Sequence, residues 1–96
     1  MTFEWDARKA AANLKKHRVA FEDAATVFLD PLAITFPDPD HSADGNREIT
    51  IGCTLKEQVV FVSHCERGER IRVISARLAT LSERRQYEEG AGDETE

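Results

Sequence analysis

Three strand-like segments follow one another in the second half of the chain, with only short connectors between them. They are REITIGCT (47–54), QVVFVSHCE (58–66) and RIRVISARLA (70–79). Connectors of this length cannot hold a crossover helix, so consecutive strands must run antiparallel. This is the strongest constraint on the fold, because it places an antiparallel meander in a chain whose other half is helical in pattern.

Alternation assigns a face of the sheet to most side chains of the first two strands. Ile49 and Ile51 point one way, whereas Glu48 and Thr50 point the other. The middle strand is apolar on both sides, which predicts a central strand that is covered on both faces.

The last strand carries arginines in a stretch that is otherwise typical of a buried strand. Arg70 and Arg72 alternate with Ile71 and Val73, so the two arginines should stand on the face away from the core. Arg77 has the parity of the apolar residues. It should therefore point away from Arg72 unless a bulge or the strand end turns it.

The N-terminal half predicts a short strand and two helices. Residues 2–5 (TFEW) are aromatic and strand-like, and Asp6 is a good N-cap for a helix that ends near His17. In residues 19–31 apolar side chains recur at i, i+3, i+4 and i+7, which indicates a second helix. Pro31 ends it, since a residue before proline disfavours helical backbone.

A strand at 33–36, a loop rich in Pro, Asp and Gly, and a last helix that begins near Thr80 complete the pattern. Thr80 and Glu83 have the spacing of a capping box. Because the strands are mostly consecutive, we expect an α+β fold: a small antiparallel sheet, two N-terminal helices packed on one face, and a C-terminal helix.

Length and charge indicate one domain with a separate tail. Ninety-six residues are enough for a single domain, which we place at 1–87. The remaining segment, 88–96, holds five carboxylates and no basic side chain, so it accounts for the net charge of −5. We expect this acidic tail to be solvated and flexible.

Several classes of protein and site are disfavoured. The sequence has neither an apolar run of membrane-spanning length nor a secretory h-region, so we expect a cytoplasmic protein. Cys53 and Cys65 lack metal-site spacing and are typical of core thiols. The chain has no phosphate loop or nucleophile elbow, and we expect no metal or cofactor. A loose cation site around His41 in DPDHSAD (38–44) stays an open alternative.

Basic side chains recur through the helices and strands and could form an anion site. The arginine fork suits phosphate, because it donates two parallel hydrogen bonds. The alternative is that the arginines pair with glutamates across the sheet, among them Glu48, Glu66, Glu69 and Glu83. The first helix also offers a polar face that includes Asn13. The basic side chains are Lys9, Lys16, His17, Arg47, Arg67, Arg70, Arg72 and Arg77.

The order of these motifs resembles the BrnT toxin family. The opening, FEWDARKAAANLKKHRVAFEDAATVFLDP, is followed by DHS, REITIG and ERGERIRVISAR, and then by ER and Y. Each piece is weak alone, but together they cover residues 3–87 in the family's order. The resemblance implies the toxin of a type II toxin–antitoxin pair. It also implies a fold similar to that of the RelE ribonucleases.

The resemblance further implies an endoribonuclease that cleaves RNA without a metal and arrests growth. It implies a DNA-binding BrnA-like antitoxin, a two-plus-two complex, and contact with operator DNA only through that antitoxin. Arginines would stabilise the phosphorane, and a base and an acid would move protons. On this basis the candidates for catalysis are His17, His64, Glu66, Arg67, Arg72 and Arg77, with Lys16 as a further proton-transfer candidate, and those for RNA binding are Lys9, Lys16, Arg47 and Arg70.

Two residues depart from the family pattern at the corner between the first two helices. Arg18 stands where the family usually has Gly, and Ala20 where it usually has a capping Ser. A left-handed residue is convenient at the first position, and a lost cap costs about 1 kcal/mol. The corner adjoins His17, so these changes favour the alternative function, a catalytically inactive module that serves as antitoxin partner and co-repressor.

Overall fold

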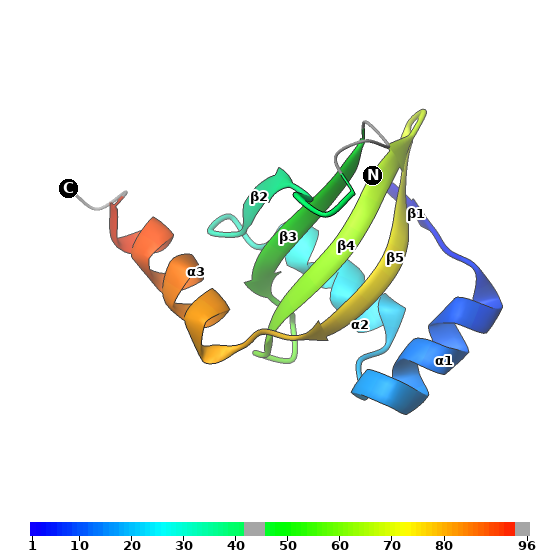
Figure 1. Ribbon diagram of the computed structural model, residues 1–96, viewed down its shortest axis with the longest axis horizontal. Coiled ribbons are helices and arrows are strands. Elements are labelled where there is room, and N and C mark those ends of the chain that lie inside the picture. The colour runs from blue at the N-terminus through cyan, green and yellow to red at the C-terminus, as the bar shows by residue number, and fades with distance from the viewer. Residues whose placement is uncertain (42–45, 94–96) are drawn as a thin grey trace.

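A five-stranded sheet forms the centre of the computed structural model, which describes residues 1–41 and 46–93 (Figure 1). Its strands lie in the order β1-β5-β4-β3-β2. The predicted meander of β3, β4 and β5 is confirmed, and β4 is the central strand. The strand bounds are β1 (Thr2–Glu4), β2 (Ile34–Pro37), β3 (Arg47–Cys53), β4 (Val59–Arg67) and β5 (Arg70–Leu78).

One edge of the sheet is parallel, and the expectation of a wholly antiparallel sheet was wrong there. Strand β1 runs parallel to β5, with Thr2 opposite Arg70 and Glu4 opposite Arg72. The short-connector argument applies only to strands that are neighbours in the chain. In the sequence, almost the whole domain separates β1 from β5, so their connection did not require an antiparallel pairing.

The first helix, α1 (Ala7–His17), has the predicted bounds. The side chain of Asp6 accepts hydrogen bonds from the backbone N–H groups of Arg8 (2.8 Å) and Lys9 (3.1 Å), as expected of its N-cap. The second helix is shorter than predicted. It consists of α2 (Phe21–Ala24) and continues as the 3₁₀ helix η1 (Ala25–Leu29).

The two faces of the sheet differ in what covers them. In Figure 1 helix α2 lies behind the sheet and α1 lies beside the β5 edge, and with η1 they bury one face, here called the helix-covered face. Its core consists of Val19, Phe21, Ala24, Val27, Val60, Val62, Val73 and Ala76. The opposite face is called the open face, and its side chains include Phe36, Ile49, Phe61, Arg72 and Arg77.

Helix α3 (Leu81–Asp93) covers one end of the open face. Gly90 lies against Ile34 of β2, and the Tyr87 hydroxyl donates a 2.7 Å hydrogen bond to Oδ2 of Asp30. The predicted capping box is confirmed, because Thr80 and Glu83 bond to each other's backbone N–H groups at 2.9 and 3.2 Å. The expected tail was 88–96, but α3 continues through the first part of it to Asp93. Residues 94–96 lie outside the described part.

In the described ranges, no helix combines the length and apolar character needed to span a membrane. Of the possible cation site, His41 Nδ1 lies 3.1 Å from Oδ2 of Asp38, whereas Asp44 lies outside the described residues. Residues 1–41 and 46–93 contain no cluster of three or more potential metal-ligating side chains.

Candidate functional site

A register shift between β4 and β5 decides where the arginines point. Ser63 of β4 lies opposite Ser75, but the next residue, His64, lies opposite Val73. Ile74 is therefore left without an opposite residue, which is the pattern of a β-bulge. Beyond this point the alternation of side chains along β5 is reversed.

The bulge brings Arg77 to the open face. Arg72 lies opposite Cys65 and Arg77 lies opposite Phe61, two β4 residues of the same parity. The sequence allowed this arrangement only if a bulge intervened, and the structure contains one. Five arginines thus stand on the open face: Arg47, Arg67, Arg70, Arg72 and Arg77.

One row of paired residues crosses the open face from β3 to β1. It consists of Arg47, Cys65, Arg72 and Glu4 and is called the arginine row below. Strands two apart in a sheet are separated by about 10 Å, so both guanidinium groups can reach an anion above Cys65. The arginine row is therefore our candidate phosphate site.

Glu4, which was not predicted from the sequence, joins the candidate site. Arg72 Nη1 donates to Oε2 of Glu4 at 2.9 Å, and Arg70 Nη1 lies 3.5 Å from Oε1. The hydrogen bond from Arg72 is the main reason that the pKa of Glu4 is below its usual value. The alternation of TFEW puts Glu4 on the face opposite Phe3, but only the parallel pairing with β5 places it beside Arg72.

Arg77 is held by a carboxylate of α3. Its two terminal nitrogens donate to the two oxygens of Glu83 at 2.8 and 2.9 Å, and its guanidinium stacks on the Phe61 ring at 4.0 Å. The hydrogen bond from Arg77 lowers the pKa of Glu83 and raises that of Arg77. The expected pairing with glutamate is therefore correct for Arg77, and for Arg70 and Arg72 the carboxylate is Glu4.

His64 lies on the helix-covered face, across the sheet from the arginines. The residue is 3% exposed; its Nε2 lies 2.7 Å from Thr50 Oγ1, and its ring packs edge-on against Phe28. Nδ1 has no hydrogen-bond partner in the described structure. Burial lowers the pKa to about 4, so the ring is neutral at pH 7. The structure thus separates His64 from the arginines, and its predicted role in proton transfer stays a prediction.

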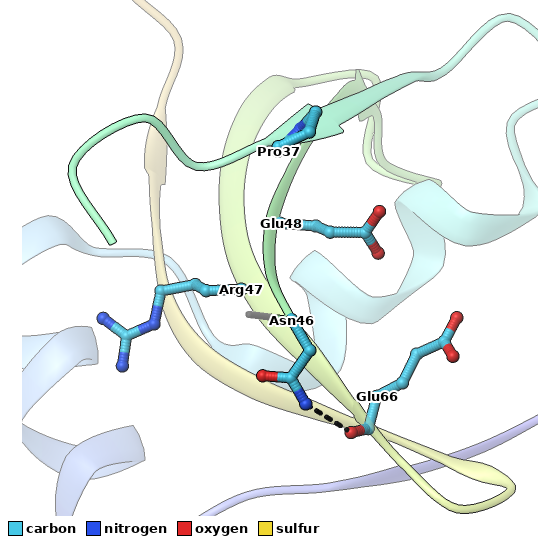
Figure 2. A pocket seen from close by; sticks show the side chains of 5 residues that line it. All are labelled: Pro37, Asn46, Arg47, Glu48 and Glu66. Carbon is cyan, nitrogen blue, oxygen red and sulfur yellow. Dashed lines mark hydrogen bonds between the residues drawn. The ribbon is translucent and has the colours of Figure 1, made fainter. Parts of the chain in front are cut away.

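Glu66 is also separated from the arginine row. Figure 2 shows Glu48 and Glu66 pointing to one side of the sheet and Arg47 to the other. These side chains, with Pro37 and Asn46, line a pocket of about 260 Å³ at the end of β3. Asn46 Nδ2 donates to the backbone carbonyl of Glu66 at 3.3 Å. Glu66 is exposed there, without access to a phosphate at Arg72.

The basic side chains of α1 lie at opposite ends of the helix. Lys9 lies in the first turn of α1, which begins three residues after Glu4 of the arginine row. Lys16 and His17 occupy the last turn. His17 is eight residues from Lys9, about 12 Å along the axis, so the structure brings Lys9 to the site more readily than His17.

Asn13 does not belong to a polar face of α1; it is buried at 8% exposure. Its Nδ2 donates to the carbonyls of Val19 (3.0 Å) and Ala76 (2.8 Å), and its Oδ1 accepts from Ala76 N–H at 3.1 Å. Because β1 pairs with β5 only up to Arg72, the outer edge at Ala76 is open, and Asn13 takes the place of a neighbouring strand.

The corner after α1 keeps its left-handed turn despite the absence of glycine. Arg18 has φ 61° and ψ 26°, and its N–H donates to the Leu14 carbonyl at 2.9 Å. Ala20 begins α2 without a side-chain cap. The departures therefore strain this corner but do not rearrange it.

The fold and site define a small α+β protein with one face packed under helices and one face lined by arginines. A family model described as ribonuclease toxin, BrnT, of type II toxin–antitoxin system matches residues 5–83, and the chain belongs to this family. The resemblance of the sequence is thereby confirmed.

Comparison with solved structures agrees with this assignment. The 1.1 Å crystal structure of the Brucella abortus ribonuclease toxin, BrnT, is 28% identical and matches with a TM-score of 0.67. The alignment covers 83% of this chain and 97% of that one. A search of curated proteins by sequence found no match. Membership thus rests on the family model and on the shared fold.

Proposed function

We propose that this chain is an endoribonuclease that cleaves RNA without a metal ion and uses the open face as its active site. The observation that carries the proposal is the arginine row, which places two guanidinium groups across one short stretch of sheet. Family membership supplies the substrate class, since the family is described as a ribonuclease toxin.

In the proposed reaction the 2′-hydroxyl oxygen attacks the adjacent phosphorus. The bond between phosphorus and the 5′-oxygen breaks, and the products are a 2′,3′-cyclic phosphate and a free 5′-hydroxyl. Negative charge accumulates on the phosphoryl oxygens in the transition state. Arg72 and Arg47 stabilise that charge, and removal of one such donor typically costs 10²–10³ in kcat.

Glu4 is the group we assign to accept the 2′-hydroxyl proton. It is a carboxylate in hydrogen-bond contact with Arg72, so a phosphate bound there lies next to it. Lys9, an exposed side chain in the first turn of α1 and close in sequence to Glu4, is assigned the proton for the leaving 5′-oxygen. His17 is the second candidate for that proton, from the far end of α1.

The family description places the protein in a type II toxin–antitoxin system. We propose that the chain acts in the cytoplasm and arrests growth, and that a BrnA-like DNA-binding antitoxin neutralises it. We further propose a complex of two toxins and two antitoxins that reaches operator DNA through the antitoxin. The open face is the surface whose coverage would block RNA.

The test is to assay the purified chain on RNA in excess EDTA and to induce it in cells without an antitoxin. We expect cleavage that EDTA does not reduce, fragments with cyclic phosphate ends, and growth arrest. Loss of cleavage in EDTA that returns with a divalent ion would contradict metal independence. Intact RNA and normal growth with folded protein would contradict the enzyme itself.

A second function is favoured by the carboxylates that already occupy the arginines. Arg72 binds Glu4, and Arg77 binds Glu83 through both oxygens. A chain whose arginines stay occupied would be an inactive module that serves only as antitoxin partner and co-repressor. Folded protein that binds antitoxin but leaves RNA intact is the result that this alternative predicts.

A further inference from the structure

A second pocket lies on the open face, beside the arginine row and where α3 begins. Its volume is about 420 Å³, and nothing in the proposed phosphate chemistry uses it. The side chains that matter here come from four strands, the loop after β2 and α3: Phe36, Ile49, Phe61, Arg77, Asp40 and Gln86.

The width of the pocket suits one flat ring. Ile49 is buried at 5% exposure and forms the floor, with its neighbour Phe36 on one side. Phe61, capped by the Arg77 guanidinium at 4.0 Å, stands on the other side and is offset along β4, because it pairs with Ile51 rather than with Ile49. Strands β2 and β4 are two spacings apart, about 10 Å. A ring between two plates needs about 7 Å, because each contact is about 3.5 Å.

The rim of the pocket is rich in hydrogen-bond acceptors. Asp38 is engaged within its loop, where it accepts from the Asp40 N–H at 2.9 Å, and Glu83 is engaged with Arg77. Asp40 and Gln86 are exposed side chains on the same rim. Asp40 therefore offers a carboxylate with two acceptor oxygens at the mouth of an aromatic slot.

The pocket also adjoins the proposed phosphate site. The Asp38 N–H donates to the Arg47 carbonyl at 3.0 Å, and the Arg47 charge acts on the Asp38 carboxylate. Arg47, a member of the arginine row, is thus bonded through its backbone to Asp38 of the pocket lining. A single strand of RNA could place a phosphate on the row and an unstacked base in the pocket, as aromatic and arginine plates allow.

We propose that this pocket binds a guanine base of the RNA substrate and sets sequence preference, an inference that rests on the proposed ribonuclease function. Guanine presents two adjacent donors, N1–H and the N2 amino group, which match the two oxygens of one carboxylate. Adenine and cytosine present an amino group beside an acceptor nitrogen, and uracil presents one N–H between two carbonyls. Asp40 is the specificity residue, and Phe36 and Phe61 are the plates, with the Arg77 guanidinium stacked on Phe61.

The first test measures binding without catalysis. We expect GMP to bind about tenfold more tightly than UMP by calorimetry, with NMR shifts at Phe36 and Phe61. Asp40→Asn should remove the preference, and Phe36→Leu should weaken both nucleotides. Glu88→Gln is the matched control, because it removes one negative charge from an exposed position of α3. It should change neither the affinity for the nucleotides nor the preference between them. Equal binding of the two nucleotides, or shifts confined to the helix-covered face, would overturn the proposal.

The second test uses cleavage and separates the inference from the function on which it rests. Oligonucleotides that differ at one base should be cut best when that base is guanine, and Asp40→Asn should raise KM for this substrate with little change in kcat. Preferential GMP binding without any RNA cleavage would refute the function but support the pocket. Cleavage that Asp40→Asn slows equally for every sequence would refute the pocket but support the function.

Discussion

The two faces of one sheet are built from the same strands and have opposite chemistry. Toward the helices, β4 and β5 present Val62, Val73 and a neutral, buried His64. On the other side the same strands present Arg72 and Arg77, paired with carboxylates and partly exposed. The difference separates stability from function: what lies under the helices holds the fold, and what lies on the open face is available to a ligand.

Desolvation explains why the titratable groups divide in this way. A charged imidazole against Phe28 of η1 would lose its hydration without gaining a charged partner, so burial keeps His64 neutral. Guanidinium groups on the open face keep water or a carboxylate beside them. Each prediction below tests whether a residue belongs to the face, and hence to the role, assigned to it.

The largest effect is expected for Arg72→Ala. The substitution removes a charge that we place at the developing phosphorane, so kcat for RNA cleavage should fall about 10²–10³-fold. Stability should change little, since the ion pair with Glu4 is partly exposed. Single-turnover cleavage and urea unfolding of the same preparation measure the two effects.

Arg84→Ala is the matched control, because Arg84 is an exposed arginine of α3 that is not one of the five arginines of the open face. It should retain the activity of the parent chain. Comparable activity in Arg72→Ala and the parent would show that the arginine row is not the catalytic site.

The next effect is a loss of stability in acid that arises on the helix-covered face. His64 has a pKa of about 4 when folded and about 6.5 when unfolded, so the unfolded chain binds the extra proton between these values. Its contribution is complete above pH 6.5 and is lost as the pH falls toward 4. The free energy of unfolding should decrease by on the order of 3 kcal/mol over this window.

The carboxylates with lowered pKa values, such as Asp30 and Glu83, lose their stabilising contribution only as the pH falls below their ordinary pKa values. The variant His64→Leu therefore isolates the contribution of His64 at higher pH. Thr50 keeps a partner in the variant, because its Oγ1 lies 2.7 Å from that of Thr35. The difference between the two unfolding curves should be flat above pH 6.5 and sloped below it. RNA cleavage at pH 7 should be unchanged, and its loss would return His64 to the active site.

The sequence predicted much of the fold because its strongest signals are local. The meander, the bounds of α1 and the capping box at Thr80 follow from alternation, short connectors and cap residues, each of which acts over a few positions. The second helix was overestimated, since periodicity cannot distinguish α2 from the 3₁₀ turn that follows it.

The candidate site was less predictable because it depends on pairing between distant segments. Glu4 reaches Arg72 only through the parallel edge, and Arg77 joins the open face only through the bulge at Ile74. His64 was a candidate only because imidazole can transfer protons near neutral pH. The residues near it in the sequence do not indicate that Phe28 of η1 covers it. The number of arginines in the sequence suggested an anion site, but the pairing of the strands determined which side chains lie on its face.

A smaller stability effect is expected for Asn13→Ala. The substitution leaves the N–H and carbonyl of Ala76 and the carbonyl of Val19 without this partner in a buried place. The loss should be about 2–3 kcal/mol by chemical denaturation, because buried polar groups without partners are costly. Asn46→Ala removes a longer, exposed bond to Glu66 and should cost less than about 0.5 kcal/mol.

The smallest effects are expected at the corner beside His17, where Arg18→Gly and Ala20→Ser restore the family pattern. Glycine relieves the φ of 61°, and serine can cap α2, so each should add about 0.5–1 kcal/mol to the free energy of unfolding. The changes should add, unless the shared turn couples them. Cleavage per folded molecule should stay the same if the corner serves only the helix-covered face. A rise in kcat, abolished by His17→Gln in the same background, would instead show that the corner positions His17 for proton transfer and that Lys9 is not the acid.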